Sequence, residues 1–327
     1  MILVWAGFLL FIIVLLALDL GVFHRRDHVP TGREALAFTT VTAVLALGFS
    51  AFVFVAYSNH WQGLGLLVDA IGGRPNDGYS ATVRFLTAYI VELSLSMDNV
   101  FVIALIFGHM RVPQKYQHRV LFWGILGALA MRGAMIAGGA TLVARYHWVI
   151  YVFGAFLVIT SVRMLWAKER EKATEERWIV RWLNRRFRVT REFHEQKFTV
   201  MVDGRRWITP LAVALVLVET TDVVFAVDSI PAVFAITTDP FLVFTSNVFA
   251  ILCLRSLYFG LADLIQKFRY LNVSLAVILG IVGLKMLAGT TIDRWLGESQ
   301  NAVLLVAVLI ILATGGIASV IADRRRP

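Results

Sequence analysis

The chain has 327 residues, of which 58% are hydrophobic and 16% are charged, with a mean hydropathy of +0.74. Soluble domains are about one quarter charged, so this composition excludes a soluble globular protein and indicates an integral membrane protein. The net charge of +9 would suit nucleic acid, but basic residues beside apolar spans set membrane topology instead, and we expect no nucleic-acid partner. The single cysteine, Cys253, excludes an intrachain disulfide and a thiolate metal cluster.

Apolar runs of about 20 residues, the length needed to cross a bilayer, predict an all-α polytopic membrane protein with about nine transmembrane helices. The expected spans are 2–23, 36–57, 83–108, 120–143, 147–167, 209–235, 241–265, 273–292 and 301–321. The first run lacks a basic leader and a small-residue cleavage site, so we interpret it as a retained helix and not as a signal peptide. The chain then divides into a first membrane half (1–167), a basic loop (168–208) and a second membrane half (209–327).

The basic residues predict the orientation of these spans. Most of the 31 Lys and Arg residues fall in segments that share one side of the membrane. Because such segments are usually cytoplasmic, we expect a multi-pass protein of the inner (plasma) membrane with its N-terminus outside and its C-terminus in the cytoplasm.

The basic loop is the largest segment outside the predicted spans. Its first part, around Trp178 and Trp182, fits an amphipathic helix, and we expect the stretch from Lys168 to Arg206 to meet an anionic lipid leaflet. In its second part, Asp203-Gly204 stands between two alternating runs, which predicts a tight hairpin. Neither part has catalytic spacing, so we interpret the loop as a cytoplasmic helix-hairpin insert.

Spans three to five and spans six to eight share three landmarks in the same order. The landmarks are an acidic motif, an arginine in the next span and a basic residue before Met-Leu: Glu92, Arg132 and Arg163, then Glu219, Arg255 and Lys285. The two sets begin on opposite sides of the membrane, so they predict a 3+3 inverted repeat, as in many secondary transporters. We therefore expect an ion site near the midplane, where the two sets meet.

Among the charged residues of the predicted spans, five acids and four bases are the candidates for ion binding or charge pairing. They are Glu92, Asp98, Glu219, Asp222, Asp228, Arg132, Arg163, Arg255 and Lys285. Each charge costs about 2.5–3.5 kcal/mol at the centre of a membrane helix, so these groups must pair, take up protons, bind an ion or face water.

Helical geometry separates the acids of span six. Glu219 and Asp222 share a helix face, whereas Asp222 and Asp228 would point about 120° apart on a regular helix. We therefore expect a helix break near Val227 to Pro231, where proline removes a backbone donor, to turn Asp228 inward.

The oxygen-rich surroundings of the acids indicate a site for a hard cation. Neutral oxygens near the acids come from Ser94, Ser96, Asn99, Thr220, Thr221 and Asn247. Carboxylate, amide and hydroxyl ligands suit Mn²⁺, Mg²⁺ or Ca²⁺ better than Cu⁺ or Zn²⁺. Structural salt bridges from the acids to Arg132, Arg255 and Lys285 are the alternative.

Two stretches, VELSLSMDNVFVIALIF from Val91 and LVLVETTDVVFAVDSIPAVFAITTDPFLVFTSNVFAILCLRSLYF from Leu215, closely resemble the TerC family of membrane proteins. That family includes the Alx group of bacterial manganese exporters. The resemblance covers most of the chain and implies export of Mn²⁺, with tellurium resistance as a historical association. The family's acidic motifs correspond here to Glu92, Asp98, Asn99, Glu219, Asp222 and Asp228.

We therefore predict a secondary exporter of divalent metal and not an enzyme, with Mn²⁺ as the transported substrate and no bound organic cofactor. The predicted metal ligands are Asp98, Asp222 and Asp228 with help from Asn99, while Glu92 and Glu219 are ligands or proton carriers. Proton coupling or charge pairing is expected of Glu92, Glu219, Arg132, Arg255 and Lys285. The sequence has no GxxxxGK[ST] phosphate loop, so an ion gradient is the expected driving force.

Three other functions stay open. The first is a metal-delivery or assembly factor that acts with metal-requiring membrane or secreted proteins. The second is an exporter of oxyanions such as tellurite, or of small organic solutes, with Arg132, Arg255 and Lys285 as the anion site. The third is an intramembrane hydrolase with Asp98 and Asp228 as an aspartate dyad.

Overall fold

The computed structural model describes residues 1–23, 32–71, 73–166, 188–190, 192–261, 270–288 and 300–324. Its long helices are α1 (Ile2–Phe23), α2 (Gly32–Ser58), α3 (Gly78–His109), α4 (Gln114–Arg145), α5 (Trp148–Trp166), α7 (Pro210–Phe234), α8 (Pro240–Leu261), α9 (Leu271–Ala288) and α11 (Gln300–Arg324). Eight of them, α2 to α11, are long and apolar enough to cross a membrane, and α1 is a further apolar helix. The prediction of an all-α polytopic membrane protein is confirmed, while the total of nine spans stays a prediction.

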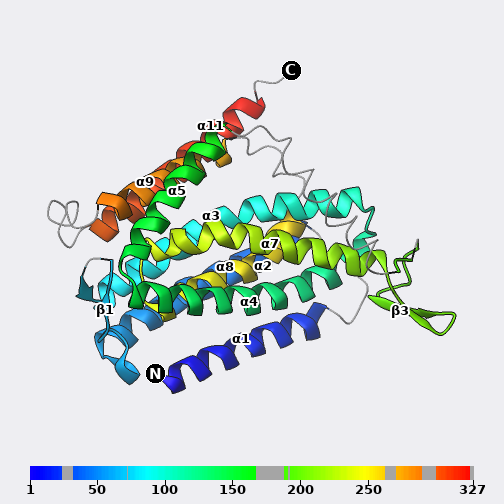
Figure 1. Cartoon of the computed structure of the whole chain (residues 1–327), viewed down its shortest axis with the longest axis horizontal. Coiled ribbons are helices and arrows are strands. Elements are labelled where there is room, and N and C mark those ends of the chain that lie inside the picture. Colours follow the sequence, from blue (N-terminus) through cyan, green and yellow to red (C-terminus); the bar gives the residue numbers. More distant parts are fainter. Residues whose placement is uncertain are drawn as a thin grey trace.

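The helices form two groups (Figure 1). Helices α2, α3, α4, α7 and α8 lie alongside one another, and α5, α9 and α11 form a group at the upper left of the view. Helix α3 packs against α8, α4 against α7, and α5 against α9. An inverted repeat would relate α3 to α7, α4 to α8 and α5 to α9, and these contacts fit such a two-fold relation. The repeat itself stays a prediction.

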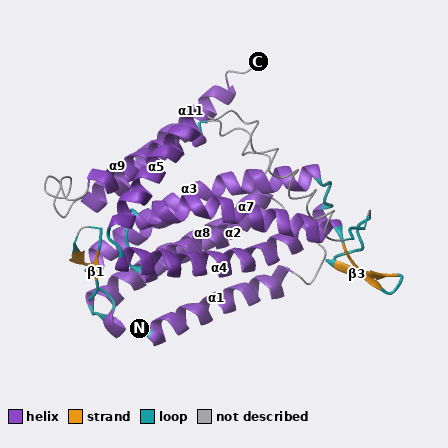
Figure 2. Ribbon diagram, in the orientation of Figure 1, coloured by secondary structure: helices purple, strands orange, loops and turns teal. Residues whose placement is uncertain are grey.

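Two small antiparallel sheets mark opposite ends of the helix bundle (Figure 2). Strand β1 (Val68–Asp69) pairs with β2 (Arg74–Pro75) at one end, and β3 (Thr199–Val202) pairs with β4 (Arg205–Ile208) at the other. We call these the β1 end and the β3 end. Helix α3 follows β2 and helix α7 follows β4 along the chain. The two helices therefore begin at opposite ends and run in opposite directions.

The predicted hairpin is confirmed. Val202 pairs with Arg205, which leaves Asp203 and Gly204 as a two-residue turn with φ values of 50° and 72°. Two positive φ values are typical of the type I′ turn, which Asp-Gly favours. The open end of the hairpin packs on α4: Phe198 directly precedes β3, and its ring centroid lies 5.3 Å from the guanidinium of Arg119. The predicted amphipathic helix around Trp178 and Trp182 lies outside the described residues.

The expected break in span six is wrong. Helix α7 is continuous from Pro210 to Phe234, with Pro231 inside it. A proline costs a helix the hydrogen bond to the carbonyl four residues earlier, which here is that of Val227. Because α7 ends three residues after Pro231, almost no helix remains beyond it to be displaced. Asp228 therefore keeps the direction that a regular helix gives it.

Candidate ion site

Arg132 of α4 is the centre of a buried polar cluster to which four helices contribute. Its guanidinium pairs with Glu92 of α3 and donates to both carboxylate oxygens of Asp222 of α7, at 3.0 and 3.3 Å. Its Nη1 atom also donates to Asn247 Oδ1 of α8 at 3.0 Å and to Ser229 Oγ of α7 at 3.4 Å. The arginine is 2% exposed and the Glu92 side chain is fully buried. The cluster therefore lies inside the bundle between α3, α4, α7 and α8.

The charges of this cluster do not balance when both acids are ionised, because two carboxylates face one guanidinium. A buried ion pair offsets its desolvation cost only when its remaining hydrogen-bonding positions are also filled. Glu92 Oε2 is buried and has no hydrogen-bond partner in the described part of the chain. The cluster therefore has capacity for one further positive charge, either a proton or a cation.

A stripe of polar residues on α3 borders the cluster. Glu92, Ser96 and Asn99 are spaced by four and three residues, which places them on one helix face. All three are buried, and within the described ranges Ser96 Oγ and Asn99 Oδ1 also have no hydrogen-bond partner. The Asn99 amide donates to Asp222 Oδ1 at 3.3 Å. Buried oxygens with unused lone pairs are the ligands that a hard cation prefers.

A pocket adjoins this stripe on the side of the β3 end. Its polar lining comes from Ser96, Arg132 and Asp222, and its apolar lining includes Ile103, Leu121, Ile125, Val218 and Leu254. Both α4 and α7 begin at the β3 end, and the pocket is lined by Arg132, Asp222 and residues that come before them in these two helices. The pocket therefore extends from the polar cluster toward the β3 end, between apolar walls.

Glu219 lies beside the cluster without joining its hydrogen bonds. Its carboxylate packs directly against Gly127 of α4, where a Cβ atom would overlap it. Its Oε2 atom is buried without a hydrogen-bond partner among the residues that the structure describes. Because Gly127 has no side chain, the Glu219 carboxylate of α7 fits between α4 and α7.

The other predicted site residues lie elsewhere. Asp228 points toward α5, where Thr160 Oγ1 donates to its Oδ1 at 3.4 Å. Asp98 is partly exposed and lies off the face of α3 that carries Glu92 and Asn99. Lys285 lies in α9, which packs on α5 and α11. The backbone of Arg255 is helical in α8, but its side chain is outside the described residues.

The structure thus brings together Glu92, Asn99, Arg132 and Asp222, and it does not bring Asp228 to Asp222. In the described ranges, no three residues among His, Cys, Asp and Glu are grouped as metal ligands. Joint coordination by Asp98, Asp222 and Asp228 stays a prediction. Sequence reasoning did not identify Ser229 as a partner of Arg132, although it follows Asp222 by seven residues and so shares its helix face.

The chain matches the family model described as "Integral membrane protein TerC family" over residues 78–326. It belongs to the TerC family. The match begins at the first residue of α3 and so includes every helix that contributes to the polar cluster of this TerC protein.

Two bacterial relatives align with most of the TerC chain. It is 48% identical over 282 residues to "Uncharacterized membrane protein STKORF319" of Myxococcus xanthus, which covers 86% of this chain and 82% of that protein. It is 43% identical over 286 residues to "Putative membrane-bound redox modulator Alx" of Escherichia coli strain K12, with coverage of 87% and 85%. No solved structure matches it.

Proposed function

We propose that this TerC protein is a secondary transporter that exports divalent metal, with Mn²⁺ as its substrate, in exchange for protons that move into the cytoplasm. The observation that carries the proposal is the stripe of buried oxygens on α3. Glu92, Ser96 and Asn99 each keep an oxygen without a hydrogen-bond partner within the described ranges, next to Asp222. A permanent structural salt bridge needs no such unused acceptors, because each costs about 1–3 kcal/mol when buried.

Competition for the same oxygens supplies a route to exchange. Arg132 now neutralises part of the negative charge of Glu92 and Asp222. A divalent cation at Asp222, Ser96 and Asn99 would replace contacts of Arg132 and displace any proton on the acids. Because metal and protons favour opposite states of a carboxylate, binding of one drives release of the other.

The remaining acids and bases have supporting roles in this proposal. Glu219, at Gly127, is a ligand or proton carrier, and Asp98 and Asp228 are further ligands along the path. Lys285 and Arg255 are charge partners.

The basic loop is proposed to meet anionic lipid on the cytoplasmic side, with the N-terminus outside. In its described part, the guanidinium of Arg188 lies 5.9 Å from the ring centroid of Trp207. An arginine beside an aromatic side chain suits the interface between lipid headgroups and acyl chains.

Two observations bear on the other functions. Arg132, the proposed anion site of an oxyanion exporter, already contacts two carboxylates, which disfavours an anionic substrate there. The Escherichia coli relative is named a redox modulator, but this chain has one cysteine, Cys253, and it is buried. Thiol–disulfide exchange within one chain needs a second thiol.

Metal uptake into proteoliposomes tests the function. Purified protein is reconstituted, a pH gradient is imposed, and accumulation of Mn²⁺, Mg²⁺ and Ca²⁺ is compared with and without the gradient. Gradient-driven accumulation of Mn²⁺ in preference to Mg²⁺ supports the exporter. Folded protein that moves none of the three metals would contradict it and would favour the metal-delivery factor.

A further inference from the structure

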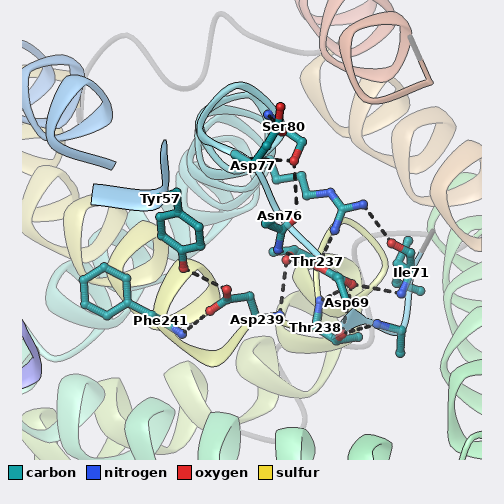
Figure 3. Close-up of polar contacts among 12 residues, drawn as sticks. Tyr57, Asp69, Ile71, Asn76, Asp77, Ser80, Thr237, Thr238, Asp239 and Phe241 are labelled. Carbon is teal, nitrogen blue, oxygen red and sulfur yellow. Dashed lines mark hydrogen bonds and ion pairs between the residues drawn. The ribbon is translucent and has the colours of Figure 1, made fainter. Parts of the chain in front are cut away.

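A second buried polar cluster lies at the β1 end of the bundle, around the carboxylates of Asp69 and Asp239 (Figure 3). Its centre is the carboxylate of Asp69, which is 2% exposed. Oδ2 accepts from Thr237 Oγ1 at 2.5 Å and from Asn76 Nδ2 at 3.2 Å, while Oδ1 accepts from the Thr238 hydroxyl at 2.9 Å and its backbone N–H at 3.1 Å. Oδ1 also accepts from the N–H of Ile71 at 2.9 Å.

Arg84 of α3 completes this cluster. It is buried, pairs with Asp69 and donates from Nη2 to the carbonyl of Ile71 at 2.8 Å. Next to it, Asp239 accepts from the Tyr57 hydroxyl at 2.8 Å and from the N–H of Phe241 at 3.0 Å. We call the contacts of Asp69 with Arg84, Thr237 and Thr238 the β1 latch. They tie the connection between α2 and α3 to the connection between α7 and α8.

The latch closes the end of the bundle opposite the pocket. Between the Arg132 cluster and the latch, the last turn of α7 and the following residues are apolar and buried, including Val233, Phe234 and Ile236, each at most 1% exposed. The Phe234 ring fills the space beside Gly139 of α4. An ion at Asp222 thus meets a pocket toward the β3 end and close packing followed by the latch toward the β1 end.

The latch and the ion site join the same two helices. Helix α3 carries both Arg84 and Glu92, which are eight residues, or about 12 Å, apart along one helix. Helix α7 carries Asp222 and leads directly into the turn that holds Thr237 and Thr238. A change in the spacing of α3 and α7 at the site would therefore reach the latch along these two helices.

We propose that the β1 latch is the gate of the ion pathway at the β1 end, and that it must part before an ion bound at Asp222 leaves in that direction. The inference rests on the proposed transport function. Polar contacts between two loops suit a gate because water replaces them when they part, whereas separating packed helices exposes apolar surface. A permanent staple between the loops is the alternative.

A reversible cross-link tests the gate. The N–H of Ala70 donates to Thr238 Oγ1 at 2.8 Å, so cysteines at these positions lie on the two sides of the latch. The double variant Ala70→Cys/Thr238→Cys is made with Cys253→Ala, and cross-linking is verified by mass spectrometry. The single-cysteine variants Ala70→Cys and Thr238→Cys, each combined with Cys253→Ala, are the controls. They show the effect of oxidation without a cross-link, and Thr238→Cys also shows the effect of losing the Thr238 hydroxyl.

Two readouts separate the outcomes. We expect the oxidised double variant to lose gradient-driven Mn²⁺ uptake while it still binds Mn²⁺, and we expect reduction to return uptake to the level of the single-cysteine controls. A cross-linked protein that transports as fast as its reduced form would overturn the gate alone. No metal movement in the wild-type and reduced proteins alike would overturn the transport function and the gate with it.

Discussion

Asp222 accepts hydrogen bonds from two nitrogens of Arg132, yet the Asp222 side chain is 12% exposed while that of Arg132 is 2% exposed. The more exposed partner of the pair is thus the acid, and it also lines the pocket. A cation that arrives through the pocket would meet Asp222 before Glu92, whose side chain is fully buried. Within the proposed transport function, this asymmetry favours Asp222 for contact with the ion and Glu92 for holding Arg132.

The pairing of Arg132 with Glu92 predicts a strong dependence of stability on both partners. Removal of one member of a buried ion pair costs about 3–5 kcal/mol because it leaves a buried charge without compensation. We expect Arg132→Ala to lower the free energy of unfolding in detergent by that amount. The double variant Arg132→Ala/Glu92→Gln should recover part of the loss. Equal stabilities of the wild type and Arg132→Ala would contradict the pairing.

Two serines on α3 provide a matched test of the oxygen stripe. Ser96 Oγ has no hydrogen-bond partner among the described residues, whereas Ser94 Oγ donates to the carbonyl of Ile90 at 2.6 Å. We expect Ser96→Ala to weaken Mn²⁺ binding about tenfold, the equivalent of one lost ligand contact of about 1.4 kcal/mol, with little change in stability. Ser94→Ala should leave Mn²⁺ affinity unchanged.

Calorimetric titration of Mn²⁺ into both purified variants makes this comparison. If the two serine variants bind Mn²⁺ equally well, the stripe does not contribute a ligand at Ser96.

Two glycines of α4 test the contact of Glu219. A Cβ atom at Gly127 would overlap the Glu219 carboxylate, whereas one at Gly138 would meet nothing within 4 Å. We expect Gly127→Ala to destabilise the protein by about 1–3 kcal/mol through overpacking and to impair transport. Gly138→Ala should have neither effect.

A second change distinguishes this clash from other causes. Glu219→Ala shortens the side chain that the new methyl group would meet, so it should restore stability when combined with Gly127→Ala. Failure of the double variant to recover would show that Gly127 serves another contact.

Burial raises the pKa of Asp239, against the lowering effect of its hydrogen bonds from Tyr57 and from backbone N–H groups. Below the ordinary aspartate pKa, near 3.9, the Asp239 carboxyl is neutral in the folded and unfolded states, and its burial does not lower the free energy of unfolding through charge. As the pH rises from there through the raised folded pKa, the unfolded state gives up its proton first, so stability falls.

The variant Asp239→Asn should lack this decrease. Melting temperatures in detergent across the acidic range check it, with Asp203→Asn in the exposed hairpin turn as the control. The same pH slope in wild type and Asp239→Asn would contradict the assignment.

Local chemistry was predictable from the sequence, and the partners of most buried groups were not. The Asp203-Gly204 turn follows from the backbone preferences of two adjacent residues, and the structure confirms it. The cost of intramembrane charge singled out Glu92, Arg132 and Asp222. Which of them meet depends on how each helix is rotated about its axis, and the sequence does not specify that.

Two features show where sequence reasoning failed. The assumed break at Pro231 would have turned Asp228 toward Asp222, but the helix continues and Asp228 meets Thr160. The ion pair of Asp69 with Arg84 gave no signal, because charged residues near the ends of spans are common and carry no insertion cost. Its burial arises from the folding of two connections onto each other, which no local pattern predicts.

Uptake by the variant Asp222→Asn tests the central claim most directly. The change keeps the size of the side chain and removes the charge for which, in the proposed mechanism, the metal and Arg132 would compete. Gradient-driven Mn²⁺ accumulation is measured in proteoliposomes with wild type, Asp222→Asn and Asp203→Asn, which removes a carboxylate in the hairpin turn. The account predicts that uptake is lost in Asp222→Asn and kept in Asp203→Asn. Folded Asp222→Asn protein that accumulates Mn²⁺ as fast as the wild type would contradict it.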